Sequence, residues 1–183
     1  MPVKSIFDPE HLYFVTTSAI GHLPLFESDS AKRLIVDCLH FLRTTGRMKL
    51  FAFVVMPNHV HVIGCFSARY TLADMLRDFK RYTARQVIAE LKARENLKLL
   101  ASLRSLNTDR RQEYKVWEDG YDSRDLLSPK MLQQKMDYVH LNPCQPQWKL
   151  VEDPVDYLWS SARFYMADLP AIVPVDDVRE SLS

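Results

Sequence analysis

The sequence has few cysteines and no excess of either charge. Its 183 residues include only three cysteines, Cys38, Cys65 and Cys144, which lie far apart and form no C-x-x-C spacing. So sparse a set argues against a disulfide framework or a structural zinc site, and it favours a reducing compartment. The formal net charge of +1 excludes a globally basic protein. Any binding to nucleic acid would therefore depend on a local basic patch.

Several signatures of other protein classes are missing as well. There is no basic-then-apolar start and no apolar run of membrane length, so we expect a cytoplasmic protein with no membrane partner. No G-x-x-x-x-G-K-[ST] loop for nucleotide phosphates occurs, and Ser160 and Ser161 lack the G-x-S-x-G context of a serine hydrolase. The hydrophobic content of 47% is sufficient for a core, and the length fits one domain.

Strand and helix patterns alternate along the chain. Residues with high β propensity predict strands at 12–17, 50–55, 60–66 and 114–117, with Pro57-Asn58 as the hairpin turn between the second and third. Apolar stripes predict helices from about residue 30 to 43, 71 to 91 and 130 to 142, and residues 92–111 are expected to form a frayed end and a loop. This order predicts an α+β, ferredoxin-like split β-α-β fold with an antiparallel sheet. The third helix would lie across the sheet face that the first two leave open.

Two histidines stand one residue apart on the third predicted strand. Because side chains alternate along a strand, His59 and His61 would point to the same face, about 7 Å apart, while Val60 and Val62 would point to the other face. Two imidazoles on one rigid strand can bind one divalent cation. The alternative is a pair of surface histidines on a half-buried strand.

The third predicted helix carries a second group of candidates. Tyr138 and Asn142 are four residues apart and therefore neighbours on one helix face. The Asn142 amide oxygen could be a third ligand beside His59 and His61, with Tyr138 next to the same ion. The alternative is a tyrosine in a helix interface and an asparagine that ends the helix. His140 falls on nearly the opposite face, where we expect it to pack.

The second predicted helix has a basic face. Arg77, Arg81 and Arg85 recur at intervals of four residues, with Lys80 beside them. Such a ridge can follow a phosphate backbone. The alternative is the ordinary solvated face of an amphipathic helix, which is the commoner origin of such a pattern.

Two blocks carry a family resemblance, Met56-Pro57-Asn58-His59-Val60-His61 and Tyr138-Val139-His140-Leu141-Asn142-Pro143. Together with Phe79-Lys80, Trp117…Gly120-Tyr121 and Asp156-Tyr157-Leu158-Trp159-Ser160-Ser161-Ala162, they make the chain resemble the single-tyrosine HUH transposases of the IS200-like family. Within these it most resembles the REP-associated tyrosine transposases.

The resemblance implies a metal-dependent endonuclease and strand transferase that cleaves single-stranded DNA next to a REP-like hairpin. It assigns His59 and His61 to a Mg²⁺ or Mn²⁺ ion, and it assigns Tyr138 as the nucleophile that forms a covalent 5′-phosphotyrosine intermediate. Asn142 falls where insertion-sequence members usually carry a glutamine that completes the metal site. Lys80 would contact the DNA, as would the arginines at 77, 81 and 85.

The same resemblance leads us to expect a nuclease domain over residues 1–145, with a tail over 146–183 packed on it. It favours a monomer over a dimer, in the bacterial cytoplasm and associated with the nucleoid. Two alternatives remain: a hairpin-binding module without catalysis, and a metal-dependent phosphoesterase that uses water. A phenol is a weak nucleophile near neutral pH, so the transposase hypothesis needs a cation at the phosphate. Of the three hypotheses, only this one requires the phenol oxygen of Tyr138.

Overall fold

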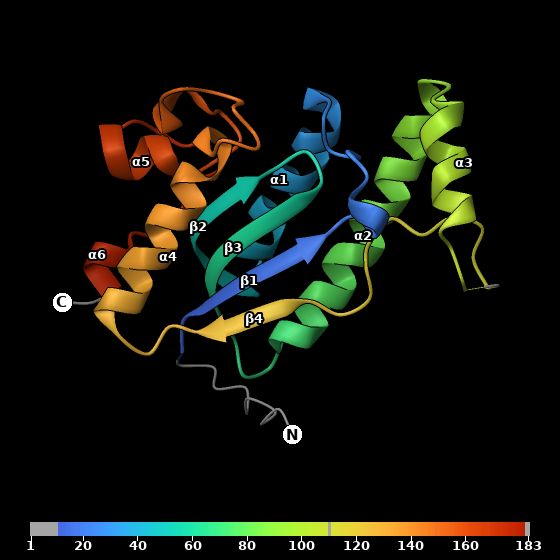
Figure 1. Cartoon of the computed structure of the whole chain (residues 1–183). Coiled ribbons are helices and arrows are strands. Elements are labelled where there is room, and N and C mark those ends of the chain that lie inside the picture. Colours follow the sequence, from blue (N-terminus) through green and yellow to red (C-terminus); the bar gives the residue numbers. More distant parts are fainter. Residues whose placement is uncertain (1–10, 110, 182–183) are drawn as a thin grey trace.

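A four-stranded antiparallel sheet organises the fold (Figure 1). The protein is described here by a computed structural model, which covers residues 11–109 and 111–181. The strands are β1 (Tyr13–Ser18), β2 (Met48–Val55), β3 (His59–Phe66) and β4 (Asp122–Asp125), in the spatial order β2-β3-β1-β4. All three neighbouring pairs are antiparallel. This order confirms the predicted ferredoxin-like fold, in which β3 lies between the parallel strands β1 and β2.

Two long helices cover one face of the sheet. They are α1 (Asp29–Thr44) and α2 (Leu72–Ala93), drawn behind the strands in Figure 1. The side chains of Val60 and Val62 on β3 point into this layer, where Leu39 of α1 and Phe79 of α2 lie against the same apolar region. Because strand side chains alternate, the even-numbered residues of β3 face the helices and the odd-numbered residues face away from them. The opposite face is therefore the one on which His59 and His61 lie.

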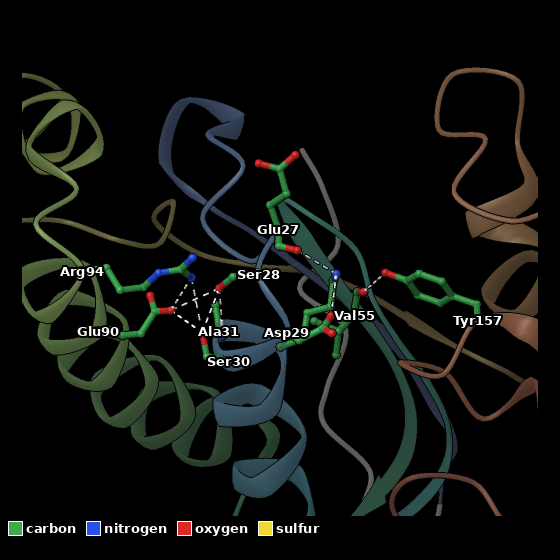
Figure 2. Close-up of polar contacts among 10 residues, drawn as sticks. Glu27, Ser28, Asp29, Ser30, Ala31, Val55, Glu90, Arg94 and Tyr157 are labelled. Carbon is green, nitrogen blue, oxygen red and sulfur yellow. Dashed lines mark hydrogen bonds and ion pairs between the residues drawn. The ribbon is translucent and has the colours of Figure 1, made fainter.

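A polar cluster joins the start of α1 to the end of α2. Ser28 caps α1 by accepting a hydrogen bond from the backbone amide of Ala31 at 3.2 Å. Figure 2 shows the Glu90 carboxylate of α2 beside Ser28, Ser30 and Arg94. Glu90 accepts hydrogen bonds from both serine hydroxyls and forms an ion pair with Arg94 at 3.0 Å. These contacts tie the start of α1 to the end of α2.

The fourth strand is not where the sequence predicted it. Residues 114–117 do not join the sheet as a strand, although Trp117 makes an isolated bridge to Ala19. Trp117 is instead a core residue, and its indole nitrogen donates to the Thr83 hydroxyl at 3.0 Å. The true β4 is the polar segment Asp122–Asp125, which pairs with β1 at the sheet edge. The prediction from β propensity was wrong for this strand, because edge strands are often polar and are stabilised by strand pairing rather than by burial.

Part of the predicted loop after α2 is also helical. Residues 97–105 form α3 (Leu97–Ser105), which begins after the capping side chain of Asn96. Leu100 and Leu103 are buried, and the packing of these two side chains stabilises the short helix. The prediction of a frayed end and loop was wrong for this segment.

The residues after β4 pack on the other side of the sheet and along its β2 edge. The elements are α4 (Pro129–Leu141), the 3₁₀ turns η2 (Asn142–Cys144) and η3 (Pro154–Asp156), and the helices α5 (Ala162–Ala167) and α6 (Val178–Ser181); a further 3₁₀ turn, η1 (Ile20–His22), follows β1. The amide of Val55 donates to the Trp159 carbonyl at 2.9 Å, and the Ser161 amide donates to the Phe53 carbonyl at 3.0 Å. The Tyr157 hydroxyl donates to the Val55 carbonyl at 2.8 Å, as Figure 2 shows. The tail therefore covers the open edge of β2.

None of the helices within residues 11–109 and 111–181 has the length and apolar character needed to cross a membrane.

Candidate active site

β3 places two imidazoles together on the sheet face opposite α1 and α2. The ring centroids of His59 and His61 are 4.6 Å apart, and the rings are steeply inclined to one another at 70°. His61 is almost fully buried, whereas His59 is partly open to solvent. The strand alternation predicted this common orientation, and the structure confirms it.

Each imidazole is oriented by an oxygen next to its Nδ1 atom. His61 Nδ1 lies 2.8 Å from the hydroxyl of Thr16, its cross-strand partner on β1. His59 Nδ1 lies 2.7 Å from Oδ1 of Asn58, and the Asn58 amide nitrogen donates a hydrogen bond to the His22 carbonyl. With a proton on each Nδ1, both Nε2 atoms keep their lone pairs. Histidines that bind metals are commonly held in this way, with the second ring nitrogen donating to an oxygen.

Helix α4 brings Tyr138 and Asn142 to the same place. α4 packs across β2 and β3 on the histidine face, and Ser128 caps its first turn ahead of Pro129. The Tyr138 ring lies 5.2 Å from the His61 ring and edge-on to Phe14 at 5.9 Å, both between centroids. Tyr138 is 43% exposed, so its phenol is accessible to a large substrate. One helix turn further on, Asn142 is buried next to His59.

Two buried polar atoms at this site lack a hydrogen-bond partner within the described residues. They are Nε2 of His61 and Oδ1 of Asn142. A buried polar atom without a partner is costly, and an electron-pair donor in this state can be satisfied by a bound ion. Both atoms are electron-pair donors, and imidazole nitrogen and amide oxygen suit a divalent cation such as Mn²⁺. The residues present therefore fit a metal ion held by His59, His61 and Asn142.

The environment keeps both imidazoles neutral. Burial is the main cause that lowers the pKa of His61 to about 3, and the nearby His59 and the Lys135 ammonium act in the same direction. Burial also lowers the pKa of His59 to about 4, assisted by the nearby His22 and opposed by the Asn142 side chain. A neutral imidazole is the form that binds a metal. Around neutral pH, neither ring has to lose a proton before it can act as a ligand.

The predicted basic ridge belongs to the helical layer on the other side of the sheet. Arg77 forms ion pairs with Asp74 at 2.8 Å and Asp78 at 3.6 Å, and Arg81 pairs with Asp78 at 3.1 Å. These carboxylates neutralise much of the ridge. The structure does not bring these arginines together with His59 and His61.

Lys80 and Arg85, the other basic residues of the predicted ridge, do not reach the histidine face either. The Lys80 ammonium donates to the backbone carbonyl of Glu118 at 2.9 Å and also to that of Gly120. Burial lowers the pKa of Lys80, and these carbonyls fix its side chain to the loop that precedes β4. Arg85 lies with Arg81 and Tyr82 along the groove between α1 and α2.

Some residues of the site could not be identified from sequence spacing. Thr16 meets His61 only because of the β1–β3 register, which is a long-range feature. Trp148, whose ring lies 5.5 Å from that of His59, arrives from the tail. Asn58 is the exception, because an amide directly before a candidate ligand is a signal for an orienting hydrogen bond.

His140 occupies the packing position that the sequence predicted. It is buried, and its Nε2 lies 2.9 Å from the Ser161 hydroxyl on the tail. The same hydroxyl accepts a hydrogen bond from the Phe53 amide of β2 at 3.0 Å. His140 therefore faces away from Tyr138 and anchors α4 to the tail.

Two solved structures are similar to the fold of this chain. A structure of a REP-associated tyrosine transposase bound to a REP hairpin is similar to the chain with a TM-score of 0.63 and 16% sequence identity, over 97% of this chain and 93% of that one. A crystal structure of a proposed transposase from Deinococcus radiodurans R1 has a TM-score of 0.47 and 18% identity, over 76% of this chain and 94% of that one. No curated protein sequence is a significant match.

The family match covers both blocks of the candidate site. The model of the family described as "Transposase IS200 like" matches residues 14–142. This range is well over half of the chain and extends from β1, through His59 and His61, to Asn142. The chain therefore belongs to the family of IS200-like transposases.

Proposed function

We propose that this transposase is a metal-dependent, single-tyrosine endonuclease and strand transferase that cleaves single-stranded DNA beside a hairpin. Tyr138 is the nucleophile, and His59, His61 and Asn142 are the metal ligands. The observation that carries the proposal is the exposed Tyr138 ring 5.2 Å from the ring of His61, whose buried Nε2 has no hydrogen-bond partner within residues 11–109 and 111–181. The similar structure bound to a REP hairpin supports hairpin DNA as the substrate class.

The reaction exchanges one phosphodiester for another. The Tyr138 oxygen attacks phosphorus and forms a new P–O bond, and the bond to the 3′ oxygen of the preceding nucleotide breaks. That oxygen leaves with the electron pair and is protonated, while the phenol gives up its proton, so a 5′-phosphotyrosine and a free 3′-hydroxyl result. Attack by another 3′-hydroxyl reverses the exchange at a new junction. No nucleotide cofactor is needed because the bond energy is retained in the phosphotyrosine.

The side chains around Tyr138 have separate tasks in this scheme. His59, His61 and Asn142 would hold Mg²⁺ or Mn²⁺, which when bound supplies positive charge to neutralise a phosphate oxygen. Thr16 holds the ring of His61 in the orientation that presents Nε2. The position of α4 sets the distance between the phenol and the phosphate, which matters because displacement at phosphorus needs a defined approach.

One chain carries the complete set of residues. Tyr138 on α4 contacts the histidine face of its own sheet, so a monomer suffices for cleavage. We therefore propose a monomer in which Tyr138 acts on DNA held by its own metal site.

The test is formation of a covalent protein–DNA adduct. Purified protein is incubated with Mn²⁺ and a pool of DNA hairpins whose single-stranded flanks are randomised, and adducts are separated on a denaturing gel and sequenced. We expect a labelled adduct with the wild type and none with Tyr138→Phe. Tyr138→Phe keeps the ring packed against Phe14 and removes only the oxygen, which makes it the matched variant.

The same gel separates the alternatives. A phosphoesterase that uses water would give cut DNA without an adduct, and Tyr138→Phe would remain active. A hairpin-binding module would shift the DNA on a native gel but would give neither cut DNA nor adduct. Either result would refute the covalent mechanism.

A further inference from the structure

Lys135 forms no ion pair with a carboxylate of the described chain, and it lies next to the candidate nucleophile. It lies on α4, three residues before Tyr138 and thus on the same helix face. Its ammonium lies 4.5 Å from the centroid of the Phe14 ring and 5.1 Å from that of the Tyr138 ring. By contrast, Arg77 and Arg81 on α2 are both paired with aspartates.

Within residues 11–109 and 111–181, no oxygen accepts a hydrogen bond from the Lys135 ammonium. An aromatic face attracts a cation, but it does not accept the three N–H donors of an ammonium as an anionic oxygen does. Lys135 is half-buried, so its side chain is held at this place rather than extended into solvent. A partly desolvated cation with free donors is suited to an anion that arrives from outside.

Phe14 connects Lys135 to the rest of the site. The Phe14 ring stacks on His61 at 5.2 Å, meets Tyr138 edge-on at 5.9 Å, and has the Lys135 ammonium over its face. Phe14 is only 3% exposed, so its ring is a fixed apolar surface against which these side chains pack. A candidate metal ligand, the candidate nucleophile and an unpaired cation are thereby gathered around one ring.

We propose that Lys135 binds the phosphate that Tyr138 attacks, with its ammonium donating to a non-bridging oxygen of the DNA. This inference rests on the proposed function and adds to it the cation that the chain itself supplies. The sequence analysis expected Lys80 to contact the DNA, but the Lys80 ammonium donates to two backbone carbonyls instead. A lysine suits this position because it presents a compact charge to a phosphate oxygen.

The first experiment measures the rate of adduct formation in a single turnover with saturating hairpin DNA and Mn²⁺. Lys135→Met retains the aliphatic packing on Phe14 and removes the charge, and we expect its rate to fall by about 10- to 100-fold. Lys135→Arg keeps the charge and should recover most of the rate. Lys130→Ala removes an exposed lysine from the same helix and should react as the wild type does.

A second experiment distinguishes phosphate binding from a merely structural role. The attacked phosphate is replaced by a methylphosphonate, which has no negative charge. If Lys135 acts on that charge, Lys135→Met and the wild type should react at similar rates with this substrate. A difference of the original size would mean that Lys135 only supports the fold around Tyr138, and the proposal would be overturned.

A third measurement is independent of cleavage. The affinity for a labelled oligodeoxythymidine is measured at several salt concentrations without metal. Each phosphate contact contributes about 0.7 to the slope of log affinity against log salt for single strands, so Lys135→Met should flatten the slope by roughly that amount. If the wild type forms no adduct with any hairpin, the covalent mechanism fails. In that case the slope of log affinity against log salt still tests whether Lys135 binds a phosphate. An unchanged slope in Lys135→Met would reject this role.

Discussion

Acid should destabilise this protein in a pH range set by its buried histidines. Burial lowers the pKa of His61 to about 3 and those of His59 and His140 to about 4, compared with 6.5 for an imidazole in water. Below about pH 6.5 the unfolded chain takes up three protons that the folded chain does not. By linkage, stability is fully present above that pH and is lost as the pH falls towards 4.

The size of the effect follows from the pKa differences. Each histidine contributes about 1.4 kcal/mol per pH unit in this range, so at about pH 5 each has lost roughly 2 kcal/mol. Three histidines together lose roughly 6 kcal/mol, which is a large part of the 5–15 kcal/mol that typically separates folded from unfolded domains. We therefore expect the protein without metal to be close to unfolding at about pH 5.

Urea unfolding followed by tryptophan fluorescence, in EDTA and at several pH values, measures this loss. His140→Gln should reduce the difference between about pH 7 and pH 5 by about one third. His40→Gln replaces an exposed histidine on α1 and should leave that difference as it is in the wild type. A free energy of unfolding that stays constant down to about pH 5 would show that these imidazoles are solvated, and the reasoning about their burial would fail.

Three further changes have defined consequences. Tyr157→Phe removes a buried hydroxyl that donates to the backbone of β2 at 2.8 Å, and should lower the free energy of unfolding by about 1–2 kcal/mol in urea melts; no loss would mean that the tail can detach. A Cβ atom on Gly64 would lie 2.8 Å from the Lys49 carbonyl, so Gly64→Ala should cost about 1–3 kcal/mol, and an unchanged melting temperature would contradict this. Thr16→Val removes the hydroxyl that orients His61 and should weaken Mn²⁺ binding about tenfold or more by titration; unaltered affinity would argue against that ligand.

The sheet and the histidine pair could be predicted because both depend on short-range patterns. Strand alternation alone places His59 and His61 on one face, and the hairpin turn at Pro57-Asn58 needs only adjacent residues. The same local reasoning failed for β4, because Val116 and Trp117 have strand-like composition but are buried in the core near Thr83. A polar edge strand carries almost no local signal.

Spacing left the convergence of Tyr138 on His61 as one of two alternatives, because it depends on how α4 crosses the sheet. The resemblance to a family favoured this alternative, and long-range contacts supply its physical basis. Lys135 was overlooked for a related reason. Sequence reasoning looked for repeated positive charge and therefore selected α2, whereas a single lysine near two rings forms no pattern.

The tail is a structural part of the site, because it determines where α4 lies. α4 buries only a few side chains of its own, and one of these, His140, meets the Ser161 hydroxyl at 2.9 Å. Ser161 is in turn bonded to both the amide and the carbonyl of Phe53 on β2, and the Trp159 carbonyl accepts a hydrogen bond from the Val55 amide. The helix that carries Tyr138 is thus fastened to the sheet through the tail as well as directly. Loosening this connection would move the phenol relative to the histidines without changing Tyr138, His59 or His61.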